Sequence, residues 1–174
     1  MPETLVAFPG AEIPEEYFEC RYVTLRQPLG FPKGAERLED DSQAIHAWVV
    51  DEGKIVSVGR SHLIPPDSDG SQADHSGPGA VTCPPFPGLD STTRPAIQIR
   101  QMGTLDAYRR RGHASRIITA LEDASATNFS ANYGFLQARE PAIPFYADAG
   151  WLEIGDRFDI SDIGPHATMW KKLD

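Results

Sequence analysis

The sequence predicts an α/β fold in which helices cover both faces of a mixed, mostly antiparallel central sheet. Three observations predict it. Alternating apolar runs are interspersed with segments of helical apolar spacing, in the order β-α-β-β-β-α-β-α-β-β. A long amphipathic helix follows directly on one of the alternating runs. The composition, 40% hydrophobic and 24% charged over 174 residues, suits one globular domain spanning residues 1–174.

The first part of the chain predicts an edge strand, a helix and a hairpin. A proline followed by two glutamates suits a helix start, and Pro28-Leu29-Gly30 suits its end. The hairpin turns at Asp51-Glu52-Gly53-Lys54. We expect His46, inside a strand, to be a satisfied sheet residue. The elements expected are a strand over 4–8, a helix from Pro14 to about Arg26, a polar loop over 32–41 and strands over 44–50 and 55–64.

Residues 65–95 differ in kind from the rest of the chain. They hold four glycines and seven of the fifteen prolines, and they show little apolar periodicity. A link of this length is unusual between two strands of a compact domain. Three roles stay open: an irregular surface excursion, a cover over an acceptor pocket, or part of a homodimer contact. A brief strand over 80–82 is compatible with the sequence.

Residues 97–126 predict a strand, a short polar turn and a long helix. Small and apolar residues at three- and four-residue spacing predict the helix, namely Ala114, Ile117, Ile118, Leu121 and Ala124. Gly103 removes a side chain where another group needs to approach the strand backbone. Alternation in the strand places Ile97, Ile99 and Gln101 on one face, and Gln98, Arg100 and Met102 on the other.

The last part of the chain predicts a strand, a short helix and a closing antiparallel pair. Gly150 suits the end of the helix. The elements expected are a strand over 135–139, a helix over 141–149, and strands over 151–160 and 163–173.

The turn before the long helix suits an anion. The first turn of a helix has backbone N–H groups without intrahelical partners and carries the positive end of the helix dipole. Gly112 and Ala114 are small, and three arginines at 109–111 add positive charge. Because the chain carries a net charge of −9, this basic cluster is locally unusual. We interpret the turn as a phosphate or pyrophosphate site; the alternative is an ordinary solvated basic loop.

Three ordered motifs in the second half of the chain resemble one family. Arg109-x-x-Gly112-x-Ala114 is similar to the (Gln/Arg)-x-x-Gly-x-(Gly/Ala) signature of the GNAT superfamily of acyl-coenzyme-A-dependent N-acyltransferases. The stretch Ala138-Arg139-x-x-Ala142-x-x-Phe145-Tyr146-x-x-x-Gly150-Trp151 resembles the family's A-R-x-x-A-x-x-F-Y-x-x-x-G-F. The end, Ile163-Gly164-Pro165-His166-x-x-Met169, resembles the closing strand of small bacterial members of the ElaA type.

The resemblance implies a GNAT-like acyl-CoA N-acyltransferase fold and acetyl-CoA as co-substrate. In the family, two central strands splay apart and hold the pantetheine arm; here they would be 98–105 and 135–139. Tyr146 matches the family's tyrosine that serves as acid for the departing thiolate. The alternative is that Tyr146 only packs its helix against the rest of the protein. The expected coenzyme A contacts are Met102, Gly103, Thr104, Arg109, Arg110, Arg111, Gly112, His113, Ala114 and Ser115.

The acceptor side is less defined. Arg21-x-x-x-Leu25-Arg26-x-Pro28-Leu29-Gly30 resembles the first helix of ElaA-type members, so Arg26 either binds an acceptor carboxylate or serves as a helix-end cation. The position where many members carry a glutamate base holds Gln98, which cannot take a proton. The alternatives for the base are Glu140, His166 and Asp41. Gln98 and His166 are also candidates for acceptor binding.

We therefore expect an N-acetyltransferase that acts on a primary amine of a small-molecule or amino-acid-like acceptor by direct attack. A non-catalytic acyl-CoA sensor and a protein or peptide N-acetyltransferase are the alternatives.

The remaining features exclude other classes. Two cysteines, Cys20 and Cys83, give neither a disulfide framework nor a metal spacing, and the five histidines are scattered, so we expect no metal. The acidic net charge argues against nucleic acid. The sequence has no membrane-length apolar run and no signal-peptide pattern, so we expect a cytoplasmic protein without membrane contact.

Overall fold

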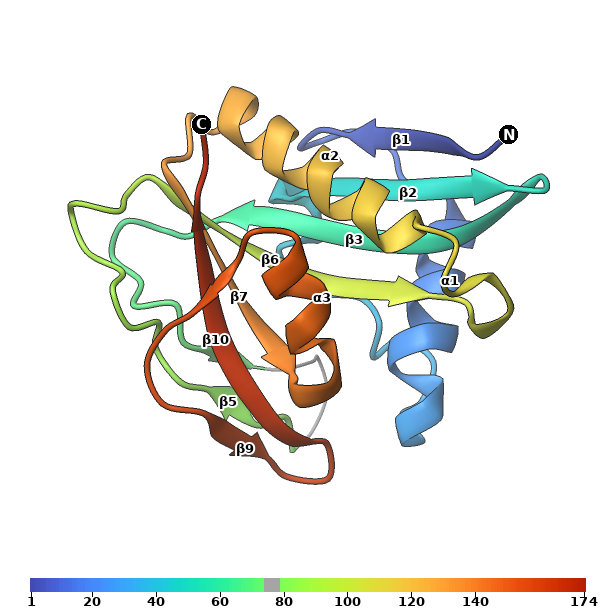
Figure 1. Ribbon diagram of the computed structural model, residues 1–174. Helices are drawn as coiled ribbons and strands as arrows, with labels where there is room; N and C mark the ends of the chain where they lie inside the picture. The colour runs from blue at the N-terminus through green and yellow to red at the C-terminus, as the bar shows by residue number, and fades with distance from the viewer. Residues whose placement is uncertain (74–78) are drawn as a thin grey trace.

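The computed structural model describes residues 1–73 and 79–174 (Figure 1). Its main sheet has the strand order β1-β2-β3-β6-β7-β10-β8, and β9 pairs with β10. All pairings in this sheet are antiparallel except that of β6 with β7. The strands are β1 (Glu3–Ala7), β2 (Ile45–Asp51), β3 (Lys54–Leu63), β6 (Ala96–Thr104), β7 (Tyr133–Arg139), β8 (Leu152–Glu153), β9 (Phe158–Ile160) and β10 (Gly164–Lys172).

Helices cover both faces of this sheet, as predicted. Figure 1 shows α2 (His113–Asn128) crossing one face over β1, β2 and β3, with α3 (Ile143–Asp148) on the same side over β7. The opposite face carries α1 (Glu15–Leu25). No helix among the described residues combines the length and the apolar character needed to cross a bilayer.

Two buried clusters hold these layers together. On the α2 face, Ile117 and Leu121 pack with the inward-facing residues of β2, β3 and β6. On the α1 face, Tyr17 and Phe18 pack with Trp48 of β2 and with strand β3. Removing this apolar area from water is the main contribution to the stability of both layers.

The described part of the 65–95 segment is irregular apart from β4 (Gln72–Ala73) and β5 (Thr82–Cys83), which pair with each other. Phe86 is buried and stacks on Phe135 of β7 with ring centroids 5.2 Å apart. The segment therefore lies against the sheet near β7. His75 and Pro78 lie outside the described residues.

Most element boundaries agree with the sequence within two residues. The closing pair is an exception, because the expected strand over 151–160 is two separate strands, β8 and β9. Gly155 between them has φ 73°, a left-handed conformation that breaks an extended strand. Cys83 lies in the short strand β5.

Candidate functional site

The parallel strands β6 and β7 pair only at their beginnings. Three residue pairs are in register, Ala96 with Tyr133, Ile97 with Gly134 and Gln98 with Phe135. Both strands continue beyond these pairs, to Thr104 and to Arg139, without pairing with each other. The sheet is therefore open between the second halves of its two central strands, which leaves backbone groups facing a gap.

A β-bulge in β6 changes which residues face this gap. Against β3, Val58 is opposite Gly103 and Arg60 is opposite Arg100, so Gly59 faces two residues. These two residues are Gln101, which has a left-handed φ of 58°, and Met102. Such an insertion shifts the alternation by one residue.

The predicted faces of Gln101 and Met102, beyond Arg100, are therefore wrong. A Cβ on Gly59 would meet the Met102 sulfur and Ile117 of α2, so Met102 lies on the α2 face together with Ile97 and Ile99. Gln101 instead accepts a hydrogen bond from Arg26 at the end of α1.

The close approach expected at Gly103 comes from the protein itself. A Cβ there would lie 2.2 Å from the Thr24 hydroxyl oxygen and 3.3 Å from Leu25. The missing side chain thus lets the last turn of α1 pack directly against β6.

The turn between β6 and α2 is open at its glycine. Gly112 caps the N-terminus of α2 with φ 82°, and no atom lies within 4 Å of where its Cβ would be. A left-handed residue here turns the chain so that the first N–H groups of α2 are not covered by a side chain at this position. Arg110 is also left-handed, with φ 63°.

The three arginines of this turn differ in their surroundings. Arg109 is exposed and lies 3.2 Å from an Asp106 carboxylate oxygen, so this pair is weakened by solvent. Arg111 lies 3.6 Å from Asp51 and stacks over the Tyr108 ring. Arg109 and Arg110 line the cavity described below, whereas Arg111 does not.

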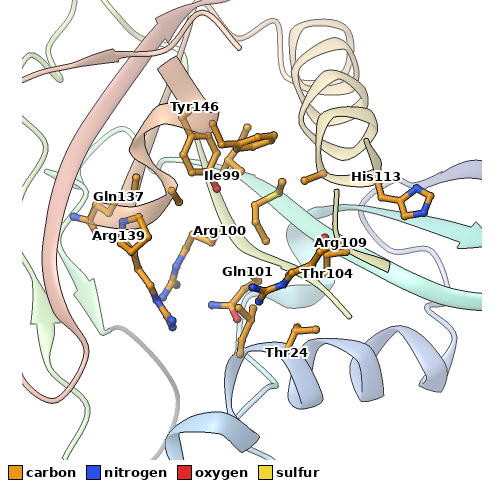
Figure 2. Close-up of a pocket in the computed structure, with 18 of the residues that line it drawn as sticks. Thr24, Ile99, Arg100, Gln101, Thr104, Arg109, His113, Gln137, Arg139 and Tyr146 are labelled. Carbon is orange, nitrogen blue, oxygen red and sulfur yellow. The ribbon is translucent and has the colours of Figure 1, made fainter. Parts of the chain in front are cut away.

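His113, the first residue of α2, is buried, and its Nε2 lies 2.9 Å from the Asp51 carboxylate. Figure 2 shows its ring turned away from the centre of the cavity. What His113 presents to the cavity is therefore mainly backbone.

A cavity of about 850 Å³ occupies the gap and extends to the α2 turn (Figure 2). Its described lining contains no aspartate and no glutamate, but it contains five arginines. Ten of the eleven residues expected to contact coenzyme A or to act as the acid line this cavity, all but Arg111; they are Met102, Gly103, Thr104, Arg109, Arg110, Gly112, His113, Ala114, Ser115 and Tyr146.

Tyr146 projects into this cavity from α3, and Figure 2 shows its hydroxyl pointing towards the gap. The ring is buried and packs edge-on against Phe145, with centroids 5.0 Å apart. Burial raises the pKa of the Tyr146 hydroxyl above its usual value, so the group is protonated at neutral pH.

The three residues proposed for the acceptor side also line the cavity, but each already has a partner. Arg26 donates to the Ala35 carbonyl oxygen at 3.2 Å and to Gln101 at 3.1 Å. Gln98 accepts from the Gln72 side chain. His166 donates from Nδ1 to the Gly164 carbonyl oxygen at 2.8 Å, because a carbonyl oxygen can only accept.

The structure separates the three alternatives for the base. Asp41 lies outside the cavity lining and pairs with Arg21 at 3.0 Å. Cationic neighbours keep its pKa low although burial opposes them. Glu140 is also outside the lining and pairs with Arg157 at 3.1 Å. Of the three, only His166 lines the cavity.

Sequence reasoning missed several lining residues. One of them is Arg100, which lies on the α1 face of β6. Its side chain donates to the Gln72 side chain at 3.0 Å and to the Ala73 carbonyl oxygen at 2.9 Å. Arg139 stood inside a recognised motif, so its position was available from the sequence. Gln101 and Gln137 lie in the two strands expected to border the gap, whereas the lining by Thr24, Cys83 and Ile160 required the tertiary structure.

Comparisons with known proteins agree with this architecture. The model of the acetyltransferase (GNAT) family matches residues 10–151. The uncharacterized N-acetyltransferase YitI of Bacillus subtilis is 35% identical over 82 residues, which are 47% of this chain and 54% of that protein. The chain therefore aligns with about half the length of this curated relative.

Two solved structures share the fold over almost the whole chain. Escherichia coli ElaA is 13% identical, with a TM-score of 0.67, and the match covers 98% of this chain and 99% of ElaA. An acyl-CoA N-acyltransferase from Pseudomonas aeruginosa is 12% identical, with a TM-score of 0.65 and coverage of 98% and 99%.

Proposed function

Because the chain belongs to the GNAT acetyltransferase family and is thus an acyltransferase, we propose that it transfers an acetyl group from acetyl-CoA to a primary amine of a small-molecule or amino-acid-like acceptor. The observation that carries the proposal is the opening between β6 and β7, which leads into the same cavity as the glycine turn before α2. An extended arm fits between unpaired strands, and an anion fits a helix N-terminus.

The residues available suit acetyl-CoA. The backbone N–H groups of 112–115 would hold the diphosphate, with Arg109 and Arg110 adding charge-assisted contacts. Arg111 would act only through the surrounding field, because it pairs with Asp51 and lies outside the lining. Backbone groups of Met102, Gly103 and Thr104 would pair with the pantetheine amides.

Attack of a neutral amine on the thioester carbonyl forms the C–N bond and breaks the C–S bond. The thiolate then needs a proton, and Tyr146 is the acid we assign, because its raised pKa keeps it protonated. The amine loses a proton, and we assign its acceptance to His166. Its Nδ1 holds a proton against the Gly164 carbonyl, so Nε2 is the basic nitrogen.

The test is a panel of amines mixed with acetyl-CoA, with release of free coenzyme A thiol as the readout. The proposal expects saturable turnover on at least one small amine. Binding of acetyl-CoA without turnover on any small amine or amino-terminal peptide would instead support a sensor. Turnover on peptides alone would support a protein N-acetyltransferase.

A further inference from the structure

The charge of the cavity lining is unlike that of the whole chain. The protein has 25 acidic and 16 basic residues, excluding histidine, yet the described lining holds five arginines and no carboxylate. Arginines gathered without acids around a concave surface create a positive potential that concentrates anions. The lining is therefore built for anionic groups.

A diphosphate accounts for only part of this charge. Arg109 and Arg110 belong to the turn before α2, where the helix dipole also favours an anion. The other three, Arg26, Arg100 and Arg139, come from the end of α1 and from the two central strands. Figure 2 shows Arg100 and Arg139 on the opposite side of the cavity from Arg109.

The bulge in β6 connects two members of this second group, Arg26 and Arg100. Arg100 lies opposite Arg60 of β3, on the α1 face, and the extra residue lets Gln101 contact Arg26 on that face as well. Gln101 thereby ties the guanidinium of Arg26 to the strand position next to Arg100. Arg100 itself is oriented by Gln72 and by the Ala73 carbonyl of the 65–95 segment.

Arg139 completes the group from β7. Its side chain is exposed, and among the described residues it has no ion pair or hydrogen bond. The planar fork of a guanidinium matches a carboxylate or phosphate with two parallel hydrogen bonds.

We propose that the amine acceptor carries an oxyanion, a carboxylate or a phosphate, which Arg139 binds together with Arg26 and Arg100. This inference rests on the proposed acetyl transfer. The same charges have a second effect, because nearby guanidinium groups lower the pKa of an acceptor ammonium. A larger fraction of the acceptor is then the neutral, nucleophilic amine, in a cavity whose described lining has no carboxylate base.

The experiment compares acceptors that differ only in their charge. Amino acids are assayed beside their carboxamides, and O-phosphoethanolamine beside ethanolamine, each with saturating acetyl-CoA. We expect the anionic member of a pair to have at least about tenfold higher kcat/KM. The pair that shows the preference identifies the oxyanion as carboxylate or phosphate.

The matched variants are Arg139→Gln and Arg157→Gln. Arg157 is also an exposed arginine near this end of the sheet, but it pairs with Glu153 and Glu140 and lies outside the lining. We expect Arg139→Gln to raise the KM of the anionic acceptor roughly 10- to 100-fold. The KM for acetyl-CoA should stay the same, Arg139→Lys should restore part of the loss, and Arg157→Gln should behave as wild type.

Three results would overturn the inference. Preference for neutral or cationic amines would remove it and leave acetyl transfer intact. A rise in the KM for acetyl-CoA in Arg139→Gln, with the acceptor KM unchanged, would assign Arg139 to the coenzyme. A lack of turnover on every amine would overturn both the inference and the proposed function.

Discussion

Tyr146 is the single side chain on which the proposed proton transfer depends. We expect Tyr146→Phe to lower kcat roughly 100-fold or more, the usual range for loss of a general acid. The affinity for acetyl-CoA should change little, because the phenyl ring keeps its packing against Phe145. Steady-state kinetics and calorimetric titration with acetyl-CoA measure the two quantities; unchanged kcat would remove Tyr146 from the acid role.

The raised pKa adds a pH criterion to the same residue. An acid is useful only while protonated, and the folded-state pKa of Tyr146 lies above its ordinary value of 10. For wild type, kcat should therefore show no loss from tyrosine ionisation up to about pH 9.

Gly112 tests the anion-binding turn. Gly112→Glu places a carboxylate where no atom lies within 4 Å, so repulsion should weaken acetyl-CoA binding by at least about tenfold. The left-handed φ also costs about 1–2 kcal/mol for a residue with a Cβ.

The control for that strain is Gly10→Glu. Gly10 has φ 86° and open space at its Cβ, and it lies outside the cavity lining. Both variants should lose similar free energy of unfolding, but only Gly112→Glu should lose affinity. Equal acetyl-CoA affinity in the two folded variants would argue against the turn as the diphosphate site.

Several single-residue positions were visible in the sequence and others were not. The places of the glycine turn and of Tyr146 at the cavity could be predicted because short motifs fix their spacing. The group that approaches Gly103 could not, since Thr24 lies 79 positions earlier in the chain and meets Gly103 only in the folded sheet. The same holds for Arg26, whose partner Gln101 is on another element.

At the scale of elements, the contact between α1 and β6 determines one wall of the cavity. We expect Gly103→Ala to destabilise the protein by about 1–3 kcal/mol, because the new methyl group overlaps Thr24. Denaturant unfolding measures this change. Thr24→Ala in the same chain should relieve part of it, which a double-mutant cycle would detect.

A free energy of unfolding within about 0.5 kcal/mol of wild type for Gly103→Ala would contradict this packing. In that case the missing side chain at position 103 would matter only for the shape of the cavity, not for packing against α1.

The strand-turn-helix unit could be predicted almost to the residue, whereas the bulge inside β6 could not. Hydrophobic alternation favours Gln101 on the side of Ile99, and nothing local marks an extra residue. The bulge follows from pairing with β3, where Gly59 leaves room for Met102 and α2. The division of the closing strand at Gly155 was likewise hidden, because a lone glycine in a strand pattern has several outcomes.

At the scale of the whole molecule, a buried ionic network joins α1 to the sheet. Arg21 pairs with Asp41, and Arg60 lies 2.8 Å from both Asp40 and Asp41. Arg60 also donates to Nδ1 of His62 at 2.8 Å, so His62 must be unprotonated there. Removing one member would leave an uncompensated buried charge.

This network predicts acid sensitivity. Burial lowers the pKa of His46 to about 4 and that of His62 to about 3, below the ordinary value of 6.5. Between pH 6.5 and 4 the unfolded chain therefore binds more protons than the folded protein, so the free energy of unfolding falls as the pH falls. Below about pH 4, protonation of Asp40 and Asp41 should lower it further, because cationic neighbours keep both pKa values low.

Denaturant unfolding at pH 7 and pH 5 measures the histidine part of this effect. We expect a loss of up to about 4 kcal/mol at pH 5, since two groups shift over 1.5 pH units at about 1.4 kcal/mol per unit. His62→Gln should show about half of that dependence. Identical free energies at the two pH values would contradict burial of neutral histidines.

The fold class and the order of the elements along the chain could be predicted because hydrophobic periodicity distinguishes strands from helices. The wall that Gln72 and Phe86 form against Gln98, Arg100 and Phe135 could not be predicted. The 65–95 segment lacks periodicity, and its contacts are with strands distant in sequence. The buried arginine network was hidden for the same reason.

A crystal structure of the protein with bound acetyl-CoA would show directly where the coenzyme lies. We expect the diphosphate on the backbone N–H groups of residues 112–115 and the pantetheine arm between β6 and β7, with its sulfur near Tyr146. Coenzyme A bound elsewhere on the molecule, with the gap between the two strands empty, would contradict this expectation.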